Sequence, residues 1–558
     1  MNMKGPIAPR DPQQKRPGFY VLLDKQVGGI PQDDGRGRHS IFISSDRLPS
    51  FASVTGGIRD AGMLNLLTTA AGFRKLVHSI GVSVEAQDRA LPVDFFLTFR
   101  GEGGPGSVHS FHFQADGVER VIDLGALSWS QFDAAPAEFR FEFPRVSDMA
   151  RATVMLYVND GFSVPPQDPD PAVDRDDPRY RAMIARSFLS AGNNARVKEF
   201  LRRARSGEPV SVAFLGGSIT QGAGAVPLQE NCYARKTWEG LKRYGGSIRY
   251  IKAGVGGTPS ETGLMRYDRD ITRDGAVLPE LVVVEFAVND LGDETEGVFY
   301  ESLVRHILNQ PNHPAVILLF AVFADDWNLK RRLAPIGYRY QLPMVDVLEA
   351  VSPQFAPERP EDRVVAKRQY FYDVYHPSNL GHQIMADCLL YLIERLDCQQ
   401  PDPVFDGYVP AWYGADYENL RLLDRRQQPQ DALIQPGSFT GTDTDLQCVP
   451  LDDEMRNTPM FPYNWMKEPG DEPFVLELEC RRLTLEFKDS GADCFGKAMV
   501  TIDGEKNRIL DPREAGWTHC HTTVLFNKNE CTRHRVEIRM CPEDKDKIFT
   551  ILGFGYVK

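Results

Sequence analysis

Apolar and polar positions change their period twice along this chain of 558 residues. From residue 18 to 162 they follow a two-residue period: Phe111 and Phe113 alternate with polar residues, and Val154 and Leu156 begin a similar run. Such a period is typical of strands with one buried face, and Gly, Pro and Asp cluster between the short runs. The pattern predicts an N-terminal β-sandwich over residues 18–162.

A linker and helices are predicted over residues 163–207. The stretch Ser163–Pro178 is rich in proline and aspartate and cannot hold a helix or a central strand. Pro178 suits the first position of a helix, and the residues up to Ala204 predict two helices separated at Gly192–Asn194.

The middle of the chain, residues 208–398, alternates apolar runs of strand length with longer helical stretches. Continuous apolar strands separated by helices predict a parallel sheet covered on both faces. In such sheets, functional groups gather where the carboxyl ends of the strands open into loops. The predicted strands are Val210–Leu215, Ile248–Ala253, Leu281–Phe286, Ala315–Phe323 and Leu342–Val347.

The last segment, residues 399–558, returns to the two-residue period. Leu476 and Leu478 alternate with glutamates, and the pair Asp503-Gly504 predicts a hairpin turn. We therefore predict a second, C-terminal β-sandwich.

Charge and composition narrow the class of protein. A hydrophobic content of 42% and a charged content of 25% are those of a soluble globular protein. The net charge of −13 excludes general nucleic-acid binding, which requires a basic surface. No apolar run approaches the ~20 residues of a membrane helix, so no membrane partner is expected. The oligomeric state cannot be predicted from these features.

The cysteines and the first residues bear on the compartment. Nine cysteines are present, and no two are spaced as Cys-x-x-Cys. An odd number of thiols suits a reducing compartment better than a disulfide framework. The first ten residues lack the apolar core of a secretory signal. We expect a cytoplasmic protein.

Ser218 is the first candidate for chemistry. A buried strand is predicted to end at Leu215, and Gly216 and Gly217 separate it from Ser218, which opens a helix. Glycines allow a sharp turn that exposes the next side chain, and a helix start favours developing negative charge. Ser218 is thus a candidate nucleophile. Taken alone, the motif also fits a capping serine or a phosphate-binding turn.

Two further motifs follow predicted strands. Gly256 and Gly257 permit close backbone approach to a ligand, so that a glycine N–H can donate to an oxyanion. Asn289 lies just past the run Leu281–Phe286, and its amide can donate in the same way. Taken singly, each is more often an ordinary turn or helix cap.

Asp373 and His376 form the last candidate group. They lie three residues apart before a predicted helix, so the carboxylate can orient the imidazole on one loop. A surface Asp–His pair is the structural alternative. His382 is the rival base, but it falls inside the helix and lacks an acid at the same spacing.

The order Ser, Gly, Asn and Asp-x-x-His resembles the motif blocks of the SGNH (GDSL-like) hydrolase superfamily. Over residues 208–398 the resemblance implies a flavodoxin-like three-layer α/β/α domain. It implies Ser218 as nucleophile, His376 as general base and Asp373 as the residue that orients the base. The mechanism that it implies requires no cofactor and no metal.

The resemblance also implies an oxyanion hole. Its donors would be the Ser218 N–H, a glycine N–H and the Asn289 amide. The glycine falls best on Gly257, with Gly256 as the alternative. The first block departs from the usual Gly-Asp-Ser, because Gly217 replaces the aspartate. The forms GGSIT, GVGGT and EFAVND look like a bacterial subgroup associated with carbohydrate acetyl esterases.

These implications predict a serine esterase that removes O-acetyl groups from acetylated oligosaccharides of the plant polysaccharide type. Trp327 and Asp326, or Asp325, follow the fourth predicted strand and are candidates for sugar binding, with Gly256 beside them; a packing role for Trp327 fits as well. An O-acyltransferase with the same triad, or a non-catalytic carbohydrate-binding protein, are the alternatives. The cluster His519–His521 has no matching second ligand pair, so no metal site is predicted.

Overall fold

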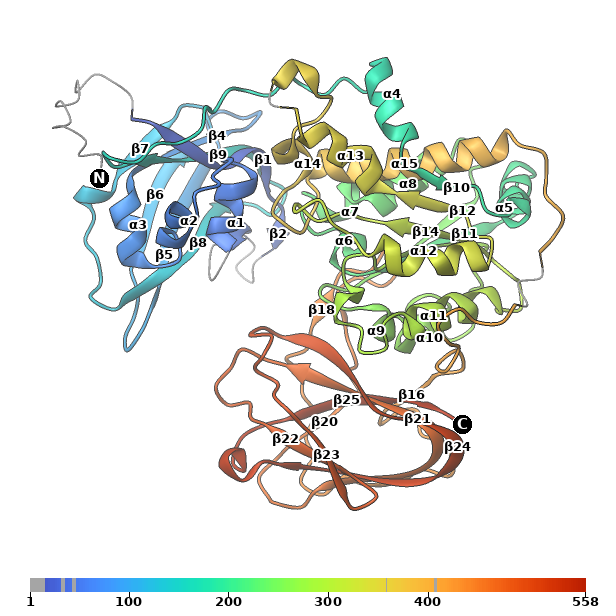
Figure 1. Cartoon of the computed structure of the whole chain (residues 1–558). Coiled ribbons are helices and arrows are strands. Elements are labelled where there is room, and N and C mark those ends of the chain that lie inside the picture. The colour runs from blue at the N-terminus through green and yellow to red at the C-terminus, as the bar shows by residue number, and fades with distance from the viewer. Residues whose placement is uncertain (1–15, 32–35, 43–46, 358, 406–408) are drawn as a thin grey trace, which may run out of the picture. The chain divides into compact units, whose positions relative to one another are not determined.

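The computed structural model describes residues 16–31, 36–42, 47–357, 359–405 and 409–558, shown in Figure 1. Its contacts divide the chain into two compact units. The first unit contains Met1–Val173 and Pro357–Gly381, and the second contains Asp174–Ala356 and His382–Lys558. The first ten residues, on which the absence of a secretory signal was predicted, lie outside the described residues. The sequence-based domain boundaries stay a prediction.

The first unit is built on two antiparallel sheets. Phe95, Phe139 and Phe141 are fully buried in one apolar core, as the alternating pattern requires. One sheet has the order β1 (Gly18–Gly28), β9 (Met149–Val158), β4 (Val77–Glu85) and β7 (Arg120–Asp123). The other has the order β2 (Ile30–Pro31), β3 (Gly37–Phe42), β8 (Asp133–Phe143), β5 (Pro92–Gly101) and β6 (Val108–Gln114). The β-rich N-terminal prediction is confirmed.

Three short helices belong to the same unit, namely α1 (Arg47–Val54), α2 (Ala61–Leu66) and α3 (Ala70–Leu76). The segment Pro357–Gly381, which includes α14 (Lys367–Tyr370), also packs in this unit. It carries Asp373 and His376, although the sequence places it within the hydrolase segment.

The second unit contains the predicted parallel sheet. Its order is β10 (Phe188–Ser190), β15 (Met344–Asp346), β14 (Ala315–Phe320), β13 (Leu281–Glu285), β11 (Val210–Gly216) and β12 (Ile248–Gly254). The strands β11 to β15 are parallel, and every residue of β11, β13 and β14 is buried. The α/β fold class and all five predicted strands are confirmed.

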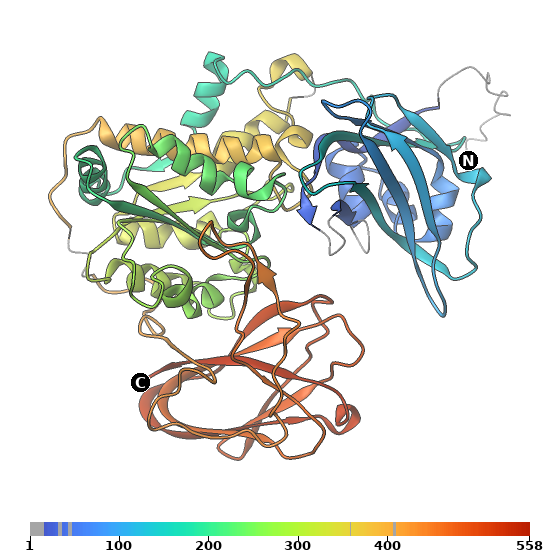
Figure 2. The same cartoon turned by 180° about the vertical axis from the view of Figure 1, so that it is seen from behind.

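Helices cover both faces of this sheet, as Figures 1 and 2 show from opposite sides. They include α5 (Ala195–Arg205), α8 (Tyr233–Leu241), α11 (Val298–Leu308), α12 (Lys330–Arg339), α13 (Val347–Phe355) and α15 (Asn379–Asp397). The helix α4 (Pro178–Ala185) begins at Pro178 as predicted, with Asp177 as its N-cap. Between α4 and α5 the chain forms β10, an antiparallel edge strand that the sequence pattern did not predict.

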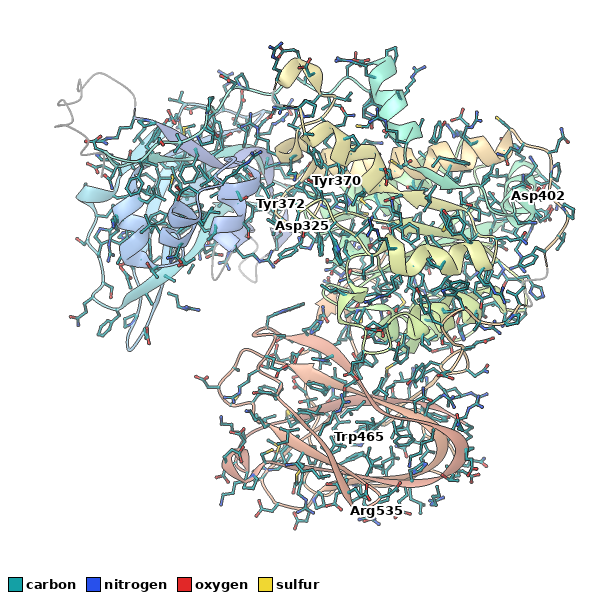
Figure 3. The ribbon with its side chains drawn as sticks, in the orientation of Figure 1. Asp325, Tyr370, Tyr372, Asp402, Trp465 and Arg535 are labelled. Carbon is teal, nitrogen blue, oxygen red and sulfur yellow. The ribbon has the colours of Figure 1, made fainter. Side chains whose placement is uncertain are left out.

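The C-terminal part of the second unit forms an eight-stranded sheet that curls round its own core, which includes Trp465, labelled in Figure 3. The principal order is β16 (Arg421–Leu423), β25 (Thr550–Val557), β21 (Phe474–Asp489), β24 (His519–Met540), β22 (Ala498–Ile502) and β23 (Glu505–Leu510). The strand β17 (Leu433–Gln435) pairs with β21, and β20 (Trp465–Met466) pairs with β25. The β-rich C-terminal prediction is confirmed, and Asp503-Gly504 forms the turn between β22 and β23.

One apolar cluster is shared by the α/β part and the C-terminal sheet of the second unit. It includes Leu264 and Met265 from the first and Cys520, Leu552 and Val557 from the second. The two parts therefore pack as one body. No helix in the described part of the chain is long and apolar enough to cross a membrane.

Candidate active site

Ser218 lies where β11 ends and the short helix α6 (Ser218–Gln221) begins. Its side chain is half-buried, whereas Gly216 and Gly217 before it are buried. A Cβ atom at Gly217 would overlap the Asn289 side chain, with Oδ1 nearest and Cγ at 2.6 Å. The absence of a side chain at Gly217 therefore makes room for Asn289. This explains the departure from Gly-Asp-Ser in structural terms.

Gly256 lies beside the serine, since a Cβ atom on Gly256 would be 3.9 Å from Ser218 Cβ. The N–H of Gly256 donates to Gln221 Oε1 over 2.8 Å, so this N–H is already used. Gly257 adopts a φ of +74°, which favours glycine, and its N–H has no hydrogen-bond acceptor among the described residues. This geometry favours Gly257 over Gly256 as an oxyanion donor.

Asn289 follows β13 and precedes the single helical turn Asp290–Gly292. Its side chain makes no capping hydrogen bond to that turn, so the helix-cap alternative does not describe it. The side chain is half-buried and packs against Gly217, which adjoins Ser218. The second unit thus brings Ser218, Gly256 and Asn289 together at the carboxyl ends of three neighbouring strands.

Asp373 and His376 form a hydrogen-bonded pair in the first unit. His376 Nδ1 lies 2.9 Å from Asp373 Oδ2, and the backbone N–H groups of Tyr375 and His376 donate to Asp373 Oδ1 over 2.8 and 2.7 Å. Asp373 is only 6% exposed, so this is no surface pair. A carboxylate only accepts, so Nδ1 carries the hydrogen and Nε2 is left as the basic nitrogen.

The electrostatics of Asp373 suit this role. Burial opposes its ionisation, but the charge and hydrogen bond of His376, the Tyr375 N–H and the Arg47 guanidinium outweigh burial and lower the pKa of Asp373. Arg47 Nη1 lies 3.4 Å from Asp373 Oδ2, and the Arg47 guanidinium lies over the Tyr375 ring. The carboxylate is therefore ionised at neutral pH and can stabilise a charged imidazole.

The loop that carries the pair is fixed by residues of the N-terminal sandwich. Lys25 Nζ donates to the carbonyls of Arg368 and Phe371 over 2.7 and 2.9 Å. His39 Nε2 lies 2.6 Å from the hydroxyl of Tyr372, labelled in Figure 3. Burial lowers the pKa of Lys25 to about 7. Sequence reasoning missed these residues, because isolated basic residues within a strand pattern carry no signal of the loop they contact.

His382 is excluded as the base by its contacts. It is fully buried, its Nδ1 accepts the backbone N–H of Tyr233 over 3.2 Å, and its Nε2 donates to the Ala223 carbonyl over 3.0 Å. Both ring nitrogens are thus engaged, one with the start of α8 and the other with the loop after α6.

The candidate sugar-binding residues lie on the loop after β14. Trp327 is half-buried, its ring stacks on Phe323 at 6.2 Å, and it packs against the shared apolar cluster. Asp326 is exposed and accepts from Ser352 Oγ over 3.2 Å, and Asp325 is exposed as well. Their role in binding sugar stays a prediction.

The cluster His519–His521 has a different environment from a metal site. His519 and His521 both contact the buried Asp489, with Nδ1 to Oδ2 distances of 2.9 and 3.1 Å. Within the described ranges, no group of three or more His, Cys, Asp or Glu side chains could hold a metal ion. His519 Nε2 instead lies 3.0 Å from the carbonyl of Gly257.

The structure therefore adds three residues of the C-terminal part to the surroundings of Gly256 and Gly257. Besides His519, Gln447 Nε2 donates to the Gly256 carbonyl over 2.8 Å. Trp517 is 47% exposed, and its Cζ2 would lie 2.8 Å from a Cβ atom at Gly257. For His519, the sequence did hold a signal: its two-residue spacing from His521 places both side chains on one face of a strand.

Residues 214–384 match the model of the GDSL-like lipase/acylhydrolase family. This segment is a carboxylic ester hydrolase domain of the SGNH type, as the motif order predicted.

Two crystal structures of a two-domain esterase called CEX, active on acetylated mannans, are similar to this chain. With mannopentaose, that esterase matches at 25% identity and a TM-score of 0.57, over 67% of this chain and 98% of that chain. Without it, identity is 25% and the TM-score 0.58, over 67% and 99%. A FAD-linked oxidoreductase from Neocamarosporium betae is 35% identical over 89 residues, which span 14% of each protein.

Proposed function

We propose that the protein is a serine esterase that removes O-acetyl groups from acetylated oligosaccharides. The observation that carries the proposal is the assembly of Ser218, the Gly256–Gly257 loop and Asn289 at one edge of the sheet. The similarity to an esterase active on acetylated mannans supports the substrate class. Action in the cytoplasm, and on oligosaccharides of the plant polysaccharide type, stays a prediction.

In the proposed reaction, His376 Nε2 takes the proton of Ser218 Oγ while the oxygen attacks the acetyl carbonyl. The pairing of His376 with Ser218 rests on the motif order in the sequence. Asp373 holds the ring through Nδ1 and stabilises its positive charge. The sugar oxygen leaves with the proton from His376. His376 then takes a proton from water as the water attacks the acyl-enzyme, and this proton returns to Ser218 Oγ as acetate is released.

The oxyanion formed at each step would be held by three donors. These are the backbone N–H groups of Ser218 and Gly257 and the Asn289 amide. One such donor contributes about 10²–10³-fold to the rate. Exposed beside Gly257, the Trp517 ring offers an aromatic face of the kind that stacks on sugar rings.

The test is acetate release from p-nitrophenyl acetate and from acetylated mannan and xylan oligosaccharides. We expect turnover by the unmodified protein and a loss of more than ~10³-fold in Ser218→Ala. Ser206→Ala is the matched control, because Ser206 is an exposed serine that caps α5. Equal turnover in Ser218→Ala and Ser206→Ala would refute the nucleophile. Transfer of acetyl to an added sugar in preference to water would indicate an acyltransferase.

A further inference from the structure

The loop that would carry the oxyanion glycine is held from the C-terminal β domain. Gly256 and Gly257 present two carbonyls, and each accepts a hydrogen bond from a side chain beyond residue 399. Gln447 Nε2 donates to Gly256 O over 2.8 Å, and His519 Nε2 lies 3.0 Å from Gly257 O. These bonds span 191 and 262 residues of sequence, all within the second unit.

The geometry of a peptide bond links the first contact to the chemistry. Gly256 O and the Gly257 N–H belong to one planar trans peptide, so they point in opposite directions. A donor that fixes Gly256 O therefore fixes the direction of the Gly257 N–H. Since the Gly256 N–H is used by Gln221, the Gly257 N–H is the one left to face an oxyanion.

Each of the two side chains is itself fixed. Gln447 is 9% exposed, and its Oε1 accepts the backbone N–H of Cys520 over 3.2 Å. His519 Nδ1 bonds Asp489, which is fully buried and lies directly opposite His519 on the neighbouring strand. Burial opposes the ionisation of Asp489, but its bonds to His519 and His521 outweigh burial and lower its pKa. The Asp489 carboxylate and the Gly257 carbonyl can only accept, so each requires a hydrogen on the His519 ring nitrogen that faces it.

We propose that Gln447 and His519 are positioning residues that hold the peptides on the two sides of Gly257, Gln447 the Gly256–Gly257 peptide and His519 the Gly257–Thr258 peptide, so that the Gly257 N–H stabilises the oxyanion. The C-terminal β domain is then a structural part of the active site. The inference rests on the proposed esterase function. It explains why Gly257 is glycine on two counts, because its φ is +74° and because a Cβ atom there would lie 2.8–2.9 Å from Trp517 and His519.

The test compares Gln447→Leu with Gln229→Leu. Gln229 Nε2 donates to the Pro450 carbonyl over 2.9 Å, so both variants remove one hydrogen bond between the α/β part and the C-terminal part. Of these two glutamines, only Gln447 contacts the Gly256–Gly257 loop. With p-nitrophenyl acetate, we expect kcat to fall about 10–100-fold in Gln447→Leu with KM unchanged, because a misplaced donor costs up to ~10²-fold. Gln229→Leu should keep the kcat of the unmodified protein.

Thermal unfolding of both variants separates positioning from loss of fold. A kcat of Gln447→Leu equal to that of Gln229→Leu would overturn the inference. Should Gln447→Leu fail to fold, His519→Phe keeps a ring against Gly257 without the donor, and an unchanged kcat in it would overturn the inference as well. Turnover by the unmodified protein together with unaffected variants refutes this inference alone, whereas absence of any turnover refutes the proposed function and this inference with it.

Discussion

The replacement Gly217→Ala tests the geometry of the oxyanion hole most directly. The φ of Gly217 is −86°, which suits any residue, so the change introduces no backbone strain. The new Cβ atom would lie 2.6 Å from Asn289 Cγ and nearer still to Oδ1. The Asn289 amide must move aside, whereas the surrounding strands need not.

The magnitude follows from the distance that a donor requires. An oxyanion donor acts at ~2.7–3.1 Å, and its removal costs about 10²–10³-fold in kcat, or ~2.7–4 kcal/mol. We expect Gly217→Ala to lose this factor, as Asn289→Ala should. The cost in stability should stay near ~1 kcal/mol, because one side chain changes its rotamer.

A double-mutant cycle on p-nitrophenyl acetate makes the test specific. If Gly217→Ala acts only through Asn289, the double variant should be no slower than Asn289→Ala, because both substitutions remove the same oxyanion donor. Gly246→Ala is the matched control, because a Cβ atom there meets nothing within 4 Å. Multiplying losses in the double variant, or full activity in Gly217→Ala, would refute the reasoning.

Three further substitutions test buried charges. Burial raises the pKa of Glu285 to about 7, so the folded state keeps a proton that the unfolded state releases. The free energy of unfolding should therefore fall by about 3 kcal/mol between pH ~4.5 and 7. In urea unfolding, Glu285→Gln should abolish this trend. For Lys25, burial lowers the pKa to about 7, so stability should rise above pH 7 by up to ~1.4 kcal/mol per unit, and Lys25→Met should flatten the pH dependence of thermal unfolding. Arg266 is fully buried and donates to Asp270 and Gly216 O over 3.1 and 3.0 Å; Arg266→Met should cost about 3–5 kcal/mol in denaturant unfolding, and a cost below ~1 kcal/mol would contradict the expectation.

The parts of the fold that the sequence predicted are those with strong periodicity. The strands β11, β13 and β14 are buried along their whole length and are largely apolar, because helices cover both faces of the sheet. The motifs after β11, β12 and β13 were found for the same reason, since each follows a clear strand end. The edge strand β10 was missed because its three residues are only half-buried and pair with one neighbour.

Side-chain roles were predictable where they depend on local spacing. Asp373 and His376 are three residues apart, so one loop suffices to join them. The motif order already placed the oxyanion glycine best on Gly257, but the physical reason for that preference depends on Gln221, which uses the Gly256 N–H. No pattern within the glycine motif records that contact.

The C-terminal contribution to the glycine loop shows the same limit over a longer range. Gln447 and His519 lie in a β-rich segment. Its alternation of apolar and polar residues predicts which side chains are buried, but not which residues they contact. His519 and His521 have a spacing that places both rings on one face of a strand, and the structure shows that this face meets Asp489 and Gly257. The Asp489 carboxylate and the Gly257 carbonyl supply hydrogen-bond acceptors for the two ring nitrogens of His519. The chemistry of such a pair is set by what the fold places opposite it, and a motif taken alone leaves both outcomes open.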